Sequence, residues 1–261
     1  MERFIAIWDT HYGFEKRSSK SVPLHDQKAI DVMLAFAEDF KPHHVVLGGD
    51  ILDCGAISHH NAKRPRKIEG LRLETDARLA RNNLIKPLEE ACSRLHRGAG
   101  RRIWIPGNHE DWIQDLLDKE PGLEGLVDPV ALLGLKDYEQ TEYGRVASLT
   151  PHLNFCHGDT VKGGENVAKT AVNHYAANIR FGHHHTYQSF TMTSPIEAEL
   201  PRNGTAVPCL CTKDPKYNEG KPNRWAQGFL YGYLHENGNF NDYVAIVING
   251  KCIANGKEFS S

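Results

Sequence analysis

Long apolar runs are absent from this sequence, and so is any excess of charge. The longest apolar runs have about five residues, as from Phe4 to Trp8, whereas a membrane-spanning helix needs roughly 20. Lysine and arginine total 31 while aspartate and glutamate total 33, so the net charge is −2. No overall field therefore attracts nucleic acid or an anionic membrane, and binding to a polyanion would need a local cluster of positive charge.

The beginning of the chain also lacks the features of a secretory signal. Met1-Glu2-Arg3 precedes an apolar run that is too short for a signal peptide, and no small-residue cleavage site follows it. We therefore expect a cytoplasmic protein with no membrane partner.

Paired cysteines are missing as well. The six cysteines show no C-x-x-C spacing, which argues against a zinc knuckle or a dithiol redox site, and a disulfide framework is not expected at 261 residues. With 40% hydrophobic and 25% charged residues, the composition is that of a globular protein, which excludes collagen, coiled coils and wholesale disorder. What the chain does contain is fifteen histidines, many of them beside Asp, Asn or Gly.

Short β-rich runs alternate with helical patterns in the first part of the chain. The runs cover residues 3–8, 44–48, 102–106 and 153–157. Residues 26–40 have apolar side chains at helical spacing, and residues 77–98 form a second such stripe, which Pro87 should kink or divide. This alternation predicts an α/β fold with a largely parallel sheet and with functional residues at the carboxyl ends of its strands.

The pattern changes after residue 187, where short strands and turn residues follow one another. The expected strands are 187–192, 205–210, 228–234, 242–248 and 251–254. They predict a second, mostly antiparallel sheet.

Polar clusters follow the predicted strands. They are Asp9-Thr10-His11, Gly48-Gly49-Asp50, Asn108-His109-Glu110, His157-Gly158-Asp159 and Gly182-His183-His184-His185. On an extended segment, residues i and i+2 point the same way, so a D-x-H or H-x-H sequence presents two ligands to one cavity. Each cluster alone could be a turn, a helix cap or a solvated loop. Together they predict a site for a borderline divalent metal such as manganese, iron or zinc.

The order of these motifs resembles that of the calcineurin-like metallophosphoesterases. The resemblance rests on D-x-H at residues 9–11, G-D-x-x-D at 49–53, G-N-H-E at 107–110, H-G at 157–158 and G-H-x-H at 182–185. It implies a four-layer α/β/β/α sandwich of two mixed sheets flanked by helices. We expect one domain over residues 1–261, with a helical insertion around residues 55–98.

The resemblance also implies a site for two divalent cations. Asp9, His11 and His185 would hold one, whereas Asn108, His157 and His183 would hold the other, and Asp50 would bridge them. Manganese is the first expectation, with iron, zinc, nickel or cobalt as alternatives. A hydroxide held between two such metals is the nucleophile of an in-line attack on phosphorus.

Two further assignments concern the substrate. By resemblance, His109 would contact the phosphoryl or leaving-group oxygen, and Asp53 would orient His109 through a hydrogen bond, although a cap or turn role for Asp53 stays open. The basic run Lys63, Arg64, Arg66 and Lys67 could bind additional phosphates of the substrate, or could be a solvated loop.

The resulting expectation is a metal-dependent phosphoester hydrolase, most simply a phosphodiesterase or nuclease acting on nucleic acid or nucleotides. Cys54 stands where the related Ser/Thr protein phosphatases have a phosphate-binding arginine, which argues against a phosphoprotein substrate. A phosphomonoesterase acting on a protein or a small molecule is the alternative. A non-catalytic scaffold of the same fold is disfavoured because all ligand positions and His109 are present.

Overall fold

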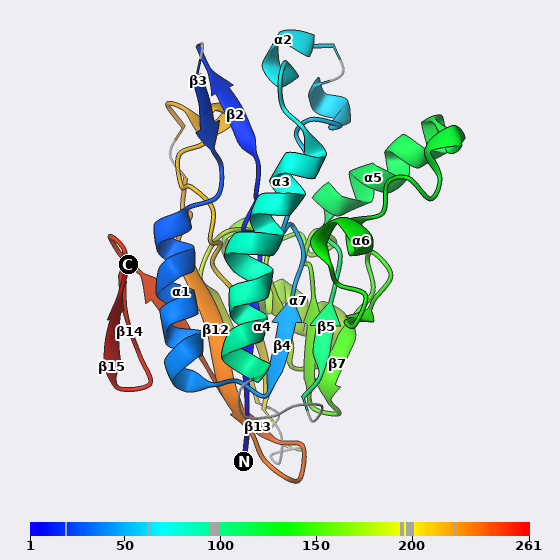
Figure 1. The fold of residues 1–261 in the computed structure, drawn as a ribbon. Helices are drawn as coiled ribbons and strands as arrows, with labels where there is room; N and C mark the ends of the chain where they lie inside the picture. Colours follow the sequence, from blue (N-terminus) through cyan, green and yellow to red (C-terminus); the bar gives the residue numbers. More distant parts are fainter. Residues whose placement is uncertain (19, 62, 94–99, 194–195, 197–200, 222) are drawn as a thin grey trace.

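Two β-sheets form the centre of the computed structural model, which describes residues 1–18, 20–61, 63–93, 100–193, 196, 201–221 and 223–261 (Figure 1). The first sheet has the strand order β13-β12-β1-β4-β5-β6. Its strands are β1 (Glu2–Ile7), β4 (His44–Leu47), β5 (Arg102–Trp104), β6 (Glu139–Gln140), β12 (Gln227–Leu234) and β13 (Phe240–Val247). In this sheet β1, β4, β5 and β6 are parallel to one another, and β12 pairs with β1 in the antiparallel direction.

The second sheet has the strand order β10-β11-β9-β8-β7. Its strands are β7 (Ala147–Thr150), β8 (Leu153–Cys156), β9 (Ile179–Phe181), β10 (Gln188–Met192) and β11 (Arg202–Ala206). Two hairpins stand apart from both sheets, namely β2 (Phe14–Arg17) with β3 (Lys20–Pro23), and β14 (Lys251–Ala254) with β15 (Lys257–Ser260).

Helices connect these strands. They are α1 (Gln27–Phe40), α2 (Pro65–Ile68), α3 (Leu73–Ala80), α4 (Lys86–Ser93), α5 (Asn108–Lys119), α6 (Pro129–Leu133) and α7 (Val167–Tyr175). A π-helical turn over Arg81–Ile85 joins α3 to α4 just before Pro87, so the long apolar stripe is divided where the sequence suggests. Short 3-10 turns cover η1 (His59–Asn61), η3 (Pro121–Leu123), η4 (Gly164–Asn166) and η5 (Lys216–Asn218).

The alternation of side chains along β1 creates the layers. Phe4, Ala6 and Trp8 pack against residues of the second sheet such as Phe155, and so form the core between the sheets. Ile5 and Ile7 point the other way, into a core with α1, α3 and α4, which cover the outer face of the first sheet (Figure 1). A third apolar cluster joins α7 to the outer face of β8 and β9. This is the expected four-layer α/β/β/α sandwich, so the predicted fold class is confirmed.

Strand partners differ from the prediction in three places. The fourth run, which becomes β8, lies in the second sheet, whereas β12 and β13 extend the first sheet and do not join the second. The run at 251–254 is β14, in a separate hairpin. β8 and β12 are both mostly buried although they belong to different sheets, so the apolar pattern of such a strand does not select its partner.

Across the described residues, every helix is too short or too polar to cross a lipid bilayer.

Asp76 on α3 is a buried carboxyl with an expected effect on stability. It is 3% exposed, and burial, with a smaller contribution from the charge of Asp53, raises its pKa to about 7. The native state therefore keeps this proton up to about pH 7, whereas the unfolded chain releases it near 3.8, the ordinary pKa of an aspartate. The contribution of this proton to the free energy of unfolding is fully present below about pH 4, and it is lost as the pH rises to about 7.

Asp76→Asn should remove this loss. We expect the free energy of unfolding that the variant gains over the parent to be about 2.5 kcal/mol larger at pH 8 than at pH 5, as measured by urea titration in the presence of a chelator. An equal difference between variant and parent at both pH values would contradict the raised pKa.

Candidate metal centre

The seven predicted ligands lie on loops at the carboxyl ends of strands in both sheets. Asp9 and His11 follow β1 and Asp50 follows β4, whereas His157 follows β8. His183 and His185 follow β9, and Asn108 begins α5 just after β5. The two sheets meet so that these loops form one cluster, with Asp50 Oδ2 3.8 Å from His11 Nε2 and 3.3 Å from His157 Nε2.

Asp9, His11 and His185 form the first half of the cluster. The Nε2 atoms of His11 and His185 are 3.2 Å apart, and His185 Nε2 is 3.6 Å from Asp9 Oδ1. All three residues are buried. Among the residues that the structure describes, none gives a hydrogen bond to the buried Oδ1 atom of Asp9, which is costly unless a cation or proton faces this atom.

Asn108, His157 and His183 form the second half. The Nδ1–H of His157 donates to the carbonyl oxygen of Gly48 at 3.0 Å, and its Nε2 lies 3.1 Å from Oδ1 of Asn108. Burial lowers the pKa of His157, but the Asp50 carboxylate outweighs burial and raises this pKa to about 10, so without a metal the ring is protonated and Nε2 also carries a proton. The rings of His157 and His183 are 5.2 Å apart. A cation bound by these residues would take the place of the Nε2 proton of His157.

The spacing of these atoms fits metal ligation. Ligand atoms at about 2.1 Å from a metal are about 3.0 Å apart in cis octahedral positions and about 3.4 Å apart in tetrahedral ones. The distances of 3.1, 3.2 and 3.3 Å lie within this span, and those from His185 to Asp9 and from His11 to Asp50, 3.6 and 3.8 Å, lie slightly above it. Asp9, His11 and Asp50 can hold one ion, and Asp50, His157 and His183 can hold another. The clustered residues therefore fit a dinuclear metal site.

The electrostatics of the cluster favour ionised carboxylates. Burial alone would raise the pKa of Asp50, but the imidazoles of His157, His109 and His11 outweigh it and hold this pKa well below its ordinary value. Burial lowers the pKa of His183 to about 4, with His157 contributing, so His183 is a neutral ligand at pH 7. Anionic carboxylates and a neutral imidazole are the forms that bind cations.

Five of the predicted ligands have a strained backbone. Asp9, His11, Asp50, His183 and His185 have positive φ angles between 47° and 63°. Side chains other than glycine rarely adopt this region, and the strain costs on the order of 1–3 kcal/mol per residue. These strained residues lie on the loops of the predicted ligands. The strained backbone therefore lowers the stability of the fold but directs these side chains to a common point.

Two glycines allow the loops to come this close. A Cβ atom at Gly107 would lie 2.1 Å from Asp50 Oδ1, and one at Gly182 would lie 2.5 Å from Asp9 Oδ2. Both contacts are far inside van der Waals distance. Any larger residue would displace the two carboxylates.

Glu110 holds two of the ligand loops together through hydrogen bonds to their backbone, a role that the sequence alone did not suggest. Its buried carboxylate accepts hydrogen bonds from the backbone N–H groups of Asp50, Leu52 and Gly107 at 2.8–2.9 Å. It therefore fastens the loop after β4 to the loop after β5. The G-N-H-E motif was the available signal, since its last residue is three positions beyond the glycine and caps the helix.

His109 lies at the edge of the cluster, with 19% of its side chain exposed. Its Nε2 is 3.8 Å from Asp50 Oδ2, and its backbone N–H donates to Asp50 Oδ1 at 2.9 Å. Its Nδ1–H donates to the backbone carbonyl oxygen of Asp53 at 2.6 Å, whereas the Asp53 carboxylate is 3.8 Å away. Asp53 thus contacts His109 through its main chain and not through the side chain that the prediction invoked.

The Asp53 carboxylate is closer to the predicted metal ligand His11 than to His109. It lies 3.5 Å from Nδ1 of His11, whereas Nε2 of the same ring is the nitrogen near His185 and Asp50. A carboxylate in this position fixes the ring of a ligating histidine and raises its basicity.

The basic run lies outside the cluster. Lys63 and Arg64 precede α2, and Arg66 and Lys67 lie within it, at the outer end of the molecule above α3 (Figure 1). All four side chains are exposed. Within the described part of the chain, no ion pair or hydrogen bond joins them to the predicted ligands. Their role in substrate binding stays a prediction.

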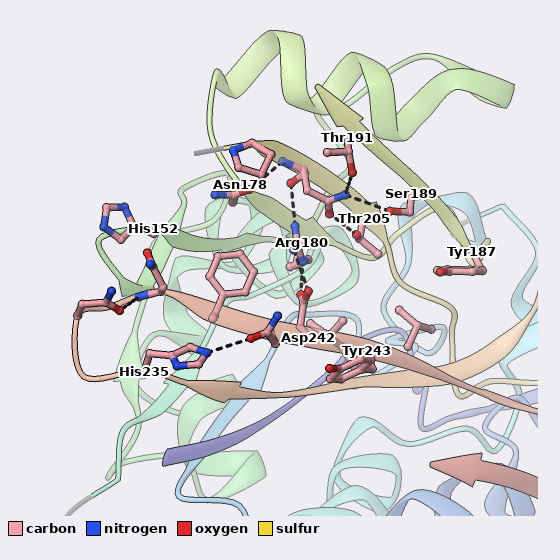
Figure 2. A pocket seen from close by; sticks show the side chains of 18 residues that line it. His152, Asn178, Arg180, Tyr187, Ser189, Thr191, Thr205, His235, Asp242 and Tyr243 are labelled. Atoms are coloured by element: carbon pink, nitrogen blue, oxygen red, sulfur yellow. Dashed lines mark hydrogen bonds and ion pairs between the residues drawn. The ribbon is translucent and has the colours of Figure 1, made fainter. Parts of the chain in front are cut away.

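A cavity of about 780 Å³ lies between the outer strands of the two sheets (Figure 2). None of the seven predicted ligands lines it. Its polar groups bond to one another: Arg180 pairs with Asp242, and the Asn203 amide donates to Ser189 and Thr191. It offers no cluster of carboxylates and imidazoles, so the metal centre is the candidate functional site.

Comparison with known proteins adds little. No protein-family model and no curated protein matches this chain. Among solved structures, it is similar to Vps29 of Chaetomium thermophilum, with 11% identity, 94% of this chain and 95% of that chain covered, and a TM-score of 0.41. It is also similar to a dimetal phosphatase from Danio rerio, with 12% identity, coverage of 90% and 93%, and a TM-score of 0.40.

The assignment of fold and centre therefore depends on this chain's own residues. Its sheet order, its three apolar clusters and its ligand loops give it the fold expected from the resemblance to the calcineurin-like metallophosphoesterases, with a cluster that fits two metal ions at the carboxyl ends of the strands.

Proposed function

We propose that this protein is a phosphoesterase that uses two divalent metals, and that phosphodiesters are its substrates. The observation that carries the proposal is the position of Asp50, whose carboxylate is shared by two groups of potential ligands while His109 stands beside it. When bound, two such cations supply a deprotonated water near neutral pH and positive charge for the phosphoryl oxygens. Manganese is the proposed metal because the ligands are carboxylate, imidazole and amide.

The chain's own groups have separate tasks in this reaction. Asp50 offsets the repulsion between the two cations. His109 is held through Nδ1 by the Asp53 carbonyl, which leaves Nε2 free to face the phosphoryl or leaving-group oxygen. A protonated Nε2 can give its proton to the departing oxygen or stabilise its charge.

A diester preference is supported by two features. The basic run at 63–67 could contact further phosphates of a chain. Cys54 is fully buried and burial raises its pKa well above the ordinary value, so the position that binds phosphate in the protein phosphatases carries an inert thiol here.

Hydrolysis of two small esters tests the proposal. The protein is stripped with a chelator, reloaded with manganese, and assayed on bis-p-nitrophenyl phosphate and p-nitrophenyl phosphate, with iron, zinc, nickel and cobalt in parallel. We expect metal-dependent release of p-nitrophenol, faster from the diester. Absence of hydrolysis with every metal would overturn the proposal, and a preference for the monoester would assign the phosphomonoesterase activity.

The basic run gives a prediction about longer substrates. Replacing its four cationic residues by Ala should raise KM for oligonucleotides and flatten the salt dependence, because fewer counterions are released on binding. Hydrolysis of bis-p-nitrophenyl phosphate should not change, since this ester is too small to reach α2. The changed residues are Lys63, Arg64, Arg66 and Lys67.

A control removes the same charge from elsewhere on the surface. It replaces four exposed lysines by Ala, namely Lys28, Lys86, Lys136 and Lys251. If both quadruple variants behave alike on oligonucleotides, the effect is one of net charge, and the run is a solvated loop.

A further inference from the structure

Three aromatic rings gather on the outer side of His109. The indole of Trp112 lies against the His109 ring, with centroids 4.1 Å apart and planes at 32°. The imidazoles of His59 and His60 meet the same indole at 5.7 and 5.6 Å, and are 3.9 Å from each other. We call His59, His60 and Trp112 the ring cluster.

The ring cluster is open to solvent. His59 and His60 are exposed on the turn η1, and Trp112 on α5 is half-buried, with part of its side chain packed on the core. The rings belong to two separate segments, so the fold brings them together beside the catalytic candidate.

The ring cluster lies within reach of whatever is bound at the metals. His109 Nε2 is 3.8 Å from the shared Asp50 carboxylate, and the His109 ring is 4.6 Å from that of His11. The next ring outward is Trp112, and the two imidazoles follow. A substrate with its phosphorus at the metals therefore has flat aromatic surface beside it, on the side where His109 stands.

We propose that the ring cluster stacks a planar base of the substrate, so that the enzyme prefers phosphodiesters of nucleosides over diesters without bases. This inference rests on the proposed function. Stacking on an aromatic side chain is tolerant of base identity because every base has a π-face. The basic run follows η1 directly in the chain, so positive charge lies on the same side as the rings.

The test compares two substrates that differ only in the bases. One is the dinucleotide thymidylyl-thymidine, and the other is the same diester with both bases replaced by hydrogen. For the parent protein with manganese, we expect kcat/KM to be about 5- to 30-fold higher for the dinucleotide. Using this ratio cancels any general effect of a variant on the metals or on His109.

Variants of Trp112 identify the surface responsible. Trp112→Leu should bring the ratio close to one, because it keeps apolar volume but loses the flat ring. Trp112→Phe should keep most of the ratio. The double variant His59→Ala/His60→Ala should lower the ratio of the two kcat/KM values, but not to one. If Trp112→Leu does not fold, this double variant at two exposed positions tests the stacking proposal.

Tyr243→Ala is the matched control. It removes another exposed aromatic ring, 50% exposed, from β13 in the other part of the first sheet, and should leave the ratio unchanged. A longer oligothymidylate, assayed in parallel with the dinucleotide, distinguishes two kinds of nucleoside substrate. A further rise in kcat/KM indicates a nucleic acid strand, and no rise indicates a small nucleotide.

The failures can be told apart. If bis-p-nitrophenyl phosphate is hydrolysed but the parent shows no preference for the dinucleotide, or Trp112→Leu keeps the preference, the stacking inference is wrong and the phosphodiesterase proposal stands. If no diester is hydrolysed with any metal, both are wrong.

Discussion

Asp50→Asn should cost the protein one or both metals and nearly all phosphoesterase activity while the fold persists. Asp50 is 2% exposed and contributes its carboxylate to both halves of the cluster. An amide has no charge to offset the repulsion between two cations, and its NH₂ group can face a metal or an imidazole lone pair in place of an acceptor oxygen. Changes in residues that merely support a ligand cost 10- to 100-fold in affinity, so we expect a loss of more than about 100-fold here.

Metal content and folding are measured separately. Elemental analysis after reloading with manganese should show fewer than two ions for each chain, and circular dichroism should show the parent's secondary structure, because the three apolar clusters do not include Asp50. Two retained metals with near-normal turnover would exclude the bridging role.

Asp159→Asn is the matched control for this variant. Asp159 is a nearby carboxylate two residues after His157, and it accepts a hydrogen bond from the Tyr143 hydroxyl at 2.6 Å. Removing it changes the local charge by the same amount without removing a predicted ligand. Its metal content should match that of the parent.

The ligand loops were predictable because their chemistry is local. A D-x-H or H-x-H sequence puts two potential ligands two positions apart at the end of a strand, and parallel strands bring such loops to one edge. The extended backbone expected for these motifs was wrong, since Asp9, His11, His183 and His185 all have positive φ angles. Other features position these side chains and could not be predicted from the spacing of the motifs. They include the positive φ angles of Asp9 and His11 and the buried carboxylate of Glu110.

Partners that are distant in sequence were the part that could not be predicted. The pairing of β12 with β1 joins residues more than two hundred positions apart, and the apolar pattern of β12 would suit either sheet. Trp112 fits the helical pattern of α5 as an ordinary core residue, and its contacts with His59 and His60 depend on how the segment after β4 folds back. The Asp53 contact with His109 is likewise set by the backbone, since the main-chain carbonyl takes the hydrogen bond.

His109→Ala should keep both metals and lower kcat by roughly 10²–10⁴-fold, the usual range for loss of a positioned acid or an electrostatic donor. The ring lies at the edge of the cluster, and its Nδ1 is committed to the Asp53 carbonyl. The two halves of the proposed dinuclear site are complete without it. Loss of metal in this variant would instead make His109 a ligand, as a group of His11, Asp53 and His109 would allow.

Leaving groups of different acidity then separate the two possible tasks of His109. If the imidazole gives a proton to the departing oxygen, His109→Ala should lose little activity on diesters of acidic phenols and much more on diesters of alkyl alcohols, because a poor leaving group needs the proton. His109→Gln, which keeps a hydrogen-bond donor but cannot release a proton, should show the same dependence. If His109→Gln instead restores turnover equally for all esters, the role of Nε2 is to stabilise charge on the phosphoryl oxygens, and the proton comes from water.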